Sequence, residues 1–415
     1  MFTNGAMSPV RRLAVTALAG VLVAAACTSS ATPSAPPASQ VASVAPATPT
    51  AGPPYKVAVT VPLSGTVAEF GLNVQNGVTL ASEQINKAGG AKGRQFAPEF
   101  LDTKCNPTEA SNVAATVASR GDFFAVIGDL CSADVLSMLP ILDRAGITMI
   151  SPGASSARIT DVIKDKGYQG WVRLAPRDLA QGEQMVRLAV TILQKKKLGV
   201  LYASDEYGQA LFAAIKDAAG LQGATIAGSE TFTPSQSQTK DFTPQLTRLK
   251  DANPEVILMA GFAAELGPAV NQMPRAGLTA PVITSAGATQ GNFTSLAGAP
   301  AEGVYVLGLY DAAAWTSEPI TKFIADYKAR FNKNPDFNSV TSYTATKVLE
   351  QAILNGATRE TLGAVARQVV LSGTPIGTVR FSQYGDVNTQ MLAVFVVKSG
   401  ALVPNAELTT KLIGG

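Results

Sequence analysis

The sequence of 415 residues contains no histidine and only three cysteines, and charged and aromatic residues make up just 15% and 7% of it. Histidine is the most common general base and a frequent zinc ligand, so its absence argues against many hydrolases and metalloenzymes. Enzymes that use carboxylates or lysines remain open. The formal net charge is +3, and Arg11 and Arg12 supply two of the positive charges. This balance gives no indication of a nucleic-acid partner.

The N-terminus has the pattern of an export signal. Arg11 and Arg12 precede an apolar run at 13–26, which is too short for an ordinary membrane-spanning helix. Small residues then lead to Cys27, an arrangement similar to the bacterial lipobox, in which the cysteine is acylated and becomes the new N-terminus. We therefore predict a lipoprotein signal peptide at 1–26 and a lipid on Cys27, which anchors the exported protein to the extracytoplasmic side of a membrane. An ordinary signal peptide followed by a chance cysteine is the alternative.

Residues 27–54 differ in composition from the rest of the chain. Proline, alanine, serine and threonine dominate this stretch, and it holds neither a charged nor an aromatic residue. Such a segment cannot bury enough apolar surface to fold by itself. We expect a disordered linker between the lipid and a folded body that begins near Tyr55.

From Lys56 onward, short apolar strands alternate with amphipathic helices. Asn106, Pro107 and Glu109 have the spacing of a helix start, with an N-cap, a first-turn proline and an acid at the third position. Strands that are apolar on both faces belong to covered parallel sheets, which predicts a doubly wound α/β fold with its ligand crevice beyond the carboxyl ends of the strands. Their number is high for one sheet, so we expect two lobes. The predicted strands are 56–61, 94–102, 123–128, 147–150, 198–203, 255–260 and 280–285.

Cys105 and Cys131 each follow one of two successive predicted strands, so a parallel sheet would bring both to the same edge. In an exported protein such a pair is expected to form a disulfide. The competing interpretation is a reactive cysteine, which needs a lowered pKa and usually a histidine partner. Since the chain has no histidine, the disulfide is favoured.

Serines follow two of the predicted strands. Ser132 comes directly after Cys131, and the segment 151–157 with the sequence SPGASSA follows the next strand. Hydroxyl groups and unpaired N–H groups at helix starts bind anions, so these two loops could hold one carboxylate. The alternative is that the serines simply cap helices. These residues alone do not decide between the two interpretations.

Several segments, in order along the chain, resemble the type I periplasmic solute-binding proteins of the leucine/isoleucine/valine-binding group. The resemblance covers 55 to about 400 and implies two lobes, three hinge crossings and closure over a small solute that is passed to an ABC transporter permease. It also implies that no reaction is catalysed and that no cofactor or metal is needed. The segments are VPLSGTVAEFGLNVQNGVTLASEQINKAGG, NPTEA, VIGDLCSADV, ISPGASSARIT, WVRLAPRDLAQG, SDEYGQAL and AEGVYV.

The resemblance also implies where the chain passes between the lobes. The crossings are expected near Leu174, Leu309 and Gly377. The first lobe would then comprise 55–174 plus 310–377, and the second 175–309 plus 378–411.

The binding residues of the family can be carried over to this chain. The carboxylate clamp of the family corresponds to the serine after the cysteine and to the loop after the next strand, and its aromatic contacts fall in three loops that follow strands. The family's cysteine pair falls on Cys105 and Cys131. The residues implied to bind ligand are Phe70, Ser132, Gly153, Ala154, Ser155, Tyr207, Phe262 and Ala286.

One position departs from the family. Amino-acid binders have an acid that pairs with the ligand's ammonium group at the position of Ala286, and no residue of 284–292 is acidic here. A buried ammonium without a counter-charge costs several kcal/mol. The sequence therefore argues against an α-amino acid as the ligand, unless Glu265 or Asp205 reaches the site from elsewhere.

The leading hypothesis is a lipid-tethered substrate-binding protein for a small amino-acid-like, carboxylate or amide solute. A second hypothesis keeps the binding fold but assigns it to a sensory partner, which sequence does not distinguish from import. A third is a secreted α/β enzyme, although the strand-end loops hold no nucleophile elbow, metal cluster or pair of acids.

Overall fold

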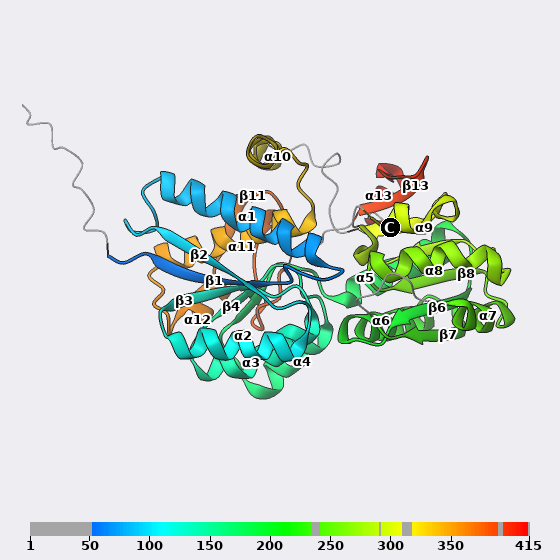
Figure 1. The fold of residues 1–415 in the computed structure, drawn as a ribbon, viewed down its shortest axis with the longest axis horizontal. Helices are drawn as coiled ribbons and strands as arrows, with labels where there is room; N and C mark the ends of the chain where they lie inside the picture. Colours follow the sequence, from blue (N-terminus) through cyan, green and yellow to red (C-terminus); the bar gives the residue numbers. More distant parts are fainter. Residues whose placement is uncertain (1–51, 235–240, 290–291, 309–317, 389–392, 414–415) are drawn as a thin grey trace, which may run out of the picture. The chain divides into compact units, whose positions relative to one another are not determined.

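The computed structural model describes residues 52–234, 241–289, 292–308, 318–388 and 393–413, which form two α/β lobes around two sheets (Figure 1). The predicted signal peptide, Cys27 and nearly all of the predicted linker lie outside these residues. Among the helices of the described part, none is long and apolar enough to cross a membrane.

The first lobe is built on a five-stranded, fully parallel sheet with the order β2-β1-β3-β4-β5. Consecutive residues of β1 point to opposite faces: Val57 and Val59 pack in one core, and Ala58 packs in the other. Helices α1, α10, α11 and α12 cover the first face, and α2, α3 and α4 cover the second. The strands are β1 (Tyr55–Val61), β2 (Phe96–Asp102), β3 (Phe123–Gly128), β4 (Met149–Ser151) and β5 (Trp171–Arg173). The helices are α1 (Ala68–Lys87), α2 (Pro107–Arg120), α3 (Ser132–Arg144), α4 (Ala157–Lys166), α10 (Glu318–Phe331), α11 (Phe337–Leu354) and α12 (Leu362–Arg367).

Helix α2 begins where the sequence predicts. The Asn106 side chain accepts hydrogen bonds from the N–H groups of Thr108 and Glu109, and Pro107 occupies the first turn. The helix ends at Gly121, which has the left-handed backbone (φ 67°) that glycine adopts without strain. The local sequence therefore sets both ends of this helix.

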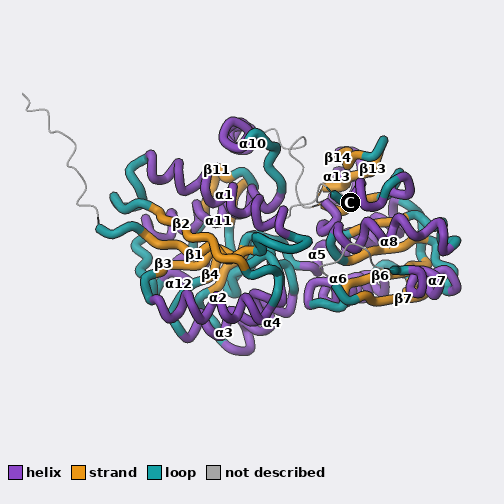
Figure 2. Tube along the Cα trace, in the orientation of Figure 1, coloured by secondary structure: helices purple, strands orange, loops and turns teal. Residues whose placement is uncertain are grey.

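The second lobe contains a seven-stranded sheet with the order β14-β13-β10-β9-β8-β6-β7. Figure 2 shows β6, β7 and β8 of this sheet with helices α6, α7 and α8. Helices α7, α8 and α9 cover one face, and α5, α6 and α13 cover the other. The strands are β6 (Lys197–Ala203), β7 (Thr225–Phe232), β8 (Val256–Ala260), β9 (Val282–Thr284), β10 (Tyr305–Gly308), β13 (Ala393–Lys398) and β14 (Ala401–Pro404). The helices are α5 (Asp178–Arg187), α6 (Glu206–Leu221), α7 (Thr243–Asp251), α8 (Ala263–Ala276), α9 (Phe293–Ala297) and α13 (Ala406–Ile413).

The two-lobed α/β fold is thus confirmed, but the second sheet is not entirely parallel. Strand β13 runs antiparallel to β10, and β14 runs antiparallel to β13. These two strands follow the chain's return from the first lobe, so no crossover helix constrains their direction. Strand β7 was not predicted because it is a half-exposed edge strand whose apolar residues are interrupted by polar ones.

The first lobe is completed by chain segments far apart in sequence. Helix α11 packs on α1, and the Asn73 side chain donates a hydrogen bond to Asp336 at the N-cap of α11. A small hairpin follows, formed by β11 (Leu371–Thr374) and β12 (Gly377–Val379).

The chain stays in the first lobe beyond Gly377, which corrects the predicted boundary. Val379 lies in the first-lobe core, and the Asp386 carboxylate pairs with Arg173 at 2.7 Å. The salt bridge and this packing hold the segment as far as 388 against the first sheet. The crossing predicted near Leu309 falls outside the described residues, while β5 ends at Arg173, next to the crossing predicted near Leu174.

Candidate functional site

A cavity of about 570 Å³ lies between the carboxyl ends of the strands of both sheets. Its walls are the loops after β1, β2, β3 and β4 in the first lobe, and those after β6, β7, β8 and β9 in the second. This is the position where doubly wound sheets bind ligands. Seven of the eight predicted binding residues line this cavity: Phe70, Ser132, Gly153, Ser155, Tyr207, Phe262 and Ala286.

The first-lobe wall offers hydrogen-bond donors. Ser132 and Ala133 line the cavity at the N-terminus of α3, where the first N–H groups have no partner within the helix. The Ser132 hydroxyl accepts a hydrogen bond from the Ser156 N–H at 3.2 Å, so its own proton can be donated to a ligand. Ser155 lies beside them on the cavity wall. Together these groups can bind a carboxylate without a cationic side chain.

Ala154 was predicted as part of this clamp but does not line the cavity. It is fully buried in the core beneath the loop, and its N–H donates to the Ser151 hydroxyl at 3.1 Å. Its amide is therefore used to hold the loop in shape. Gly153 beside it does line the cavity, and a Cβ there would lie 2.4 Å from the Leu130 side chain, which would have to move.

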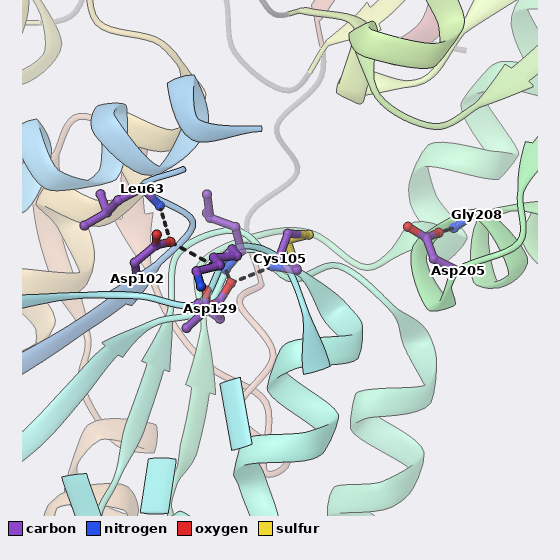
Figure 3. Close-up of a disulfide and its surroundings, with 10 residues drawn as sticks. Leu63, Asp102, Cys105, Asp129, Asp205 and Gly208 are labelled. Atoms are coloured by element: carbon purple, nitrogen blue, oxygen red, sulfur yellow. Dashed lines mark hydrogen bonds between the residues drawn. A yellow bond between two sulfur atoms is a disulfide. The ribbon is translucent and has the colours of Figure 1, made fainter. Parts of the chain in front are cut away.

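A disulfide between Cys105 and Cys131 joins the loops after β2 and β3, with 5.6 Å between the two Cα atoms. Both cysteines line the cavity. Asp129 lies next to this bridge and accepts hydrogen bonds from the N–H groups of Leu130 and Cys131 (Figure 3). The loop that carries Ser132 is thus fixed covalently on one side and by a buried carboxylate on the other.

The second-lobe wall is aromatic. Tyr207 lies in the first turn of α6, Phe262 is the N-cap of α8, and their rings stack with centroids 5.3 Å apart. Phe70 of the first lobe meets Phe262 edge to face at 6.0 Å. These three rings give the cavity an apolar surface that both lobes share.

Three acidic residues also line the cavity, all in the second lobe: Asp205, Glu206 and Glu265. Glu265 lies in the first turn of α8 and is 3% exposed. Asp205 caps α6 by accepting a hydrogen bond from the Gly208 N–H at 2.8 Å, and burial raises the pKa of its carboxyl. Among the described residues of the cavity wall, none is a lysine or an arginine. The side chains that line this part of the cavity are therefore acidic and not basic.

Glu206 connects the two lobes. Its carboxylate accepts hydrogen bonds at 2.8 Å from the Ser156 hydroxyl and from the Arg158 guanidinium, both of the first lobe. Helix α5 makes a second connection, because the Asp178 N–H at its start donates to the Ser155 carbonyl at 2.9 Å. The lobes are thus in direct contact at the edge of the cavity.

Gln181 is a cavity residue that the sequence alone does not reveal. It is 4% exposed, and its Oε1 accepts hydrogen bonds from the Ala286 N–H at 2.7 Å and from the Tyr207 hydroxyl at 3.4 Å. Burial raises the pKa of the Tyr207 hydroxyl, which therefore stays protonated. Gln181 belongs to the segment WVRLAPRDLAQG, which the sequence marks only as a crossing between lobes.

The chain is similar in sequence to known proteins. The family model described as "Periplasmic binding protein" matches residues 54–401. Leu/Ile/Val-binding protein homolog 3 of Brucella melitensis is 28% identical over 345 residues, which cover 82% of this chain and 90% of the relative.

Two solved structures are similar in fold. A leucine-binding protein from Thermotoga maritima has a TM-score of 0.77 and 24% identity, and the match covers 85% of this chain and 97% of the other. A solute-binding protein of an ABC transporter from R. palustris, in complex with benzoate, has a TM-score of 0.73 and 19% identity, covering 85% and 95%.

Proposed function

Because the chain belongs to the periplasmic binding protein family, we propose that it is the extracytoplasmic substrate-binding component of an ABC importer and captures a small amino acid with an apolar side chain. Its relatives are substrate-binding proteins. The lipid on Cys27 is part of the same proposal, with the protein anchored outside the membrane. Mass spectrometry of the mature N-terminus tests the anchor, and a free, unacylated Cys27 would contradict it.

The observation that carries this proposal is the division of the cavity into walls of different chemistry. Hydroxyl and N–H groups around Ser132 and Ser155 suit a carboxylate, whereas Glu265 and Asp205 opposite suit an ammonium group. The rings of Tyr207 and Phe262 would cover an apolar side chain. A zwitterionic amino acid with an apolar side chain would match the donors, the carboxylates and the aromatic rings.

The acidic residues of the second lobe answer the argument against an α-amino acid ligand, which was based on the missing acid at Ala286. The position of Ala286 on the wall carries no acid, and its N–H is bound to Gln181. Glu265, which α8 brings to the same cavity, is the acidic residue that would contact an ammonium group. A carboxylate without an ammonium group, such as the benzoate bound by the R. palustris protein, would meet the acidic wall with no positive charge of its own.

Solute capture follows the two-lobed geometry. A solute first bound by the donors of the first lobe would bring the second lobe against it, and the Glu206 contacts with Ser156 and Arg158 would form on closure. The closed form is then what the permease recognises. The hinge crossing near Leu174 belongs to this proposal, and the one expected near Leu309 lies outside the described residues.

The test is mass spectrometry of solute retained by the purified protein, followed by thermal shifts with L-leucine, L-valine, benzoate and butanamide. We expect leucine or valine to raise the Tm of the wild type and Glu265→Gln to lose most of that response. A larger shift with benzoate than with any amino acid would contradict an ammonium site. No response to any carboxylate would contradict the clamp itself.

Glu183→Gln is the matched control for this experiment, since Glu183 is an exposed residue of α5 outside the cavity wall. It should leave the response to every solute unchanged.

A further inference from the structure

Two aspartates lie buried behind the wall that carries the serine donors. Asp129, at the end of β3, and Asp134, in the first turn of α3, are both 0% exposed. A carboxylate oxygen of each and the Cys131 sulfur all lie within 4.8 Å of one another. Cys131 itself lines the cavity, so the two carboxyl groups lie directly behind its wall.

The two carboxyl groups differ in their hydrogen bonds. Asp129 accepts from the Thr103 hydroxyl at 2.6 Å and from two backbone N–H groups, Leu130 at 2.6 Å and Cys131 at 3.0 Å. For Asp134, neither carboxylate oxygen has a hydrogen-bond partner within the described part of the chain. An ionised carboxylate in that setting is expensive, and a second negative charge nearby makes it more so. The geometry therefore favours one charge on the pair, held by Asp129.

The surrounding charges do not change this conclusion. Asp102, at the end of β2, is a third carboxylate whose charge raises the pKa of Asp129, behind the larger effect of burial. Burial also acts on Asp102, but hydrogen bonds from Ser64 and from backbone N–H groups keep its pKa low, so it stays ionised. Figure 3 shows Asp102 and Asp129 on the same side of the disulfide. Lys104 is paired with Glu109, 3.7 Å away, and both side chains are exposed.

We propose that Asp134 holds a proton beside an ionised Asp129 and that the pair forms a proton-binding site behind the solute-binding loop, so that anion capture and proton uptake are coupled. The coupling follows from position, because Asp134 lies two residues after Ser132 on the same helix start. A second negative charge on this pair would oppose a carboxylate held by the N–H groups of α3. By reciprocity, a bound carboxylate makes the pair hold its proton more strongly.

The direction of the pKa shifts agrees with this geometry. Burial, with Asp129's charge as the second cause, raises the pKa of Asp134 to about 9, and burial raises that of Asp129 to about 6. The two values describe a coupled pair, which holds one proton between about pH 6 and pH 9. In the unfolded chain both carboxyls have pKa values near 3.9, so the native state binds the extra proton and loses stability as the pH rises from about 4 to about 9.

A cation is the other way to neutralise two carboxylates. The third atom of the cluster is the Cys131 sulfur, which lies in a disulfide and so offers no thiolate. The hard cations that carboxylates bind take six or more oxygen ligands. A proton on Asp134 removes one of the two charges and needs no further ligand.

The experiment is chemical unfolding of the solute-free protein between pH 5 and pH 9, comparing the wild type with Asp134→Asn. The variant should gain stability relative to the wild type as the pH rises, with the ratio of their unfolding constants changing by up to about tenfold per pH unit. Burial raises the pKa of Asp178 to about 7. Asp178 therefore also makes the free energy of unfolding depend on pH, but by the same amount in both proteins. Asp165→Asn, an exposed acid of α4, is the control and should follow the wild type.

If the free energy of unfolding changes equally with pH in the wild type and Asp134→Asn, the proton on Asp134 is ruled out. A Ca²⁺-dependent stabilisation that only the wild type shows would also rule it out. If Asp134→Asn does not fold, ¹³C NMR of the aspartate carboxyls in the wild type decides the question. An Asp134 resonance that titrates above pH 7 supports the proposal, and one that titrates below pH 5 overturns it.

The coupling rests on the proposed function and has its own readout. With L-leucine or benzoate as the probe, the affinity of the wild type should fall between pH 7 and pH 9, whereas that of Asp134→Asn should stay flat. Parallel pH profiles would overturn the coupling. If neither probe binds, the proposed function is contradicted, while the solute-free titration still decides the proton site.

Discussion

The two lobes offer the cavity different interactions. The first lobe contributes neutral donors on a loop fixed by the Cys105–Cys131 disulfide and by Asp129. The second contributes stacked rings and carboxylates at the starts of α6 and α8. The difference indicates that the two lobes have separate roles. A rigid anion site in the first lobe would fix the position of the solute, and the second lobe would recognise its other groups.

Asp386→Ala should destabilise the first lobe more than the removal of a surface ion pair destabilises the second. Its carboxylate is 2.7 Å from Arg173, a fully buried side chain, so Asp386→Ala leaves an uncompensated charge and should lower the free energy of unfolding by about 3–5 kcal/mol. Urea unfolding measures the loss.

The matched control for Asp386→Ala lies in the second lobe. Glu407→Ala removes an exposed ion pair with Lys411 in α13 and should leave the urea midpoint of unfolding nearly unchanged. Similar losses from the two changes would mean that Arg173 does not depend on its partner.

Phe262→Ala should weaken solute binding by about 2 kcal/mol, or roughly 30-fold, because it removes the ring that contacts both Tyr207 and Phe70. Isothermal titration with the solute that the protein retains measures this effect. Phe212→Ala serves as the comparison, since Phe212 stacks on Tyr202 at 4.2 Å outside the cavity wall. An equal loss of affinity in both variants would indicate a general effect on the second lobe and not a contact with the solute.

Of the changes at the cavity, Glu206→Gln should have the smallest effect on solute affinity. The amide oxygen can still accept from Ser156, but the charge opposite Arg158 is lost, and that guanidinium is 66% exposed. We expect a two- to five-fold loss of affinity, about 0.4–1 kcal/mol, and a weaker dependence of affinity on salt. Affinity measured at 20 and 500 mM NaCl checks this, and an unchanged salt dependence would show that the pair does not contribute to closure.

Much of the frame of this site can be predicted from sequence. Asn106 and Pro107 set the start of α2, and the order of strands places Cys105, Cys131 and Ser132 at one edge of a sheet. The rest depends on directions and distances that short-range patterns do not contain. Ala154 looks like a clamp residue, but its amide is used within the loop, and Gly377 looks like a boundary until Asp386 is seen to pair with Arg173.

By itself the sequence determined the α/β class, the two lobes and the loops in which a site would lie, because strand periodicity, helix caps and turn residues act over a few neighbouring positions. Only the tertiary structure decided that Glu265 and Gln181 reach the cavity and that Asp134 lies beside Asp129. Those facts follow from how α8, α5 and α3 pack on their sheets, and packing joins residues that are distant in the chain. The charge that Ala286 does not provide therefore comes from another helix.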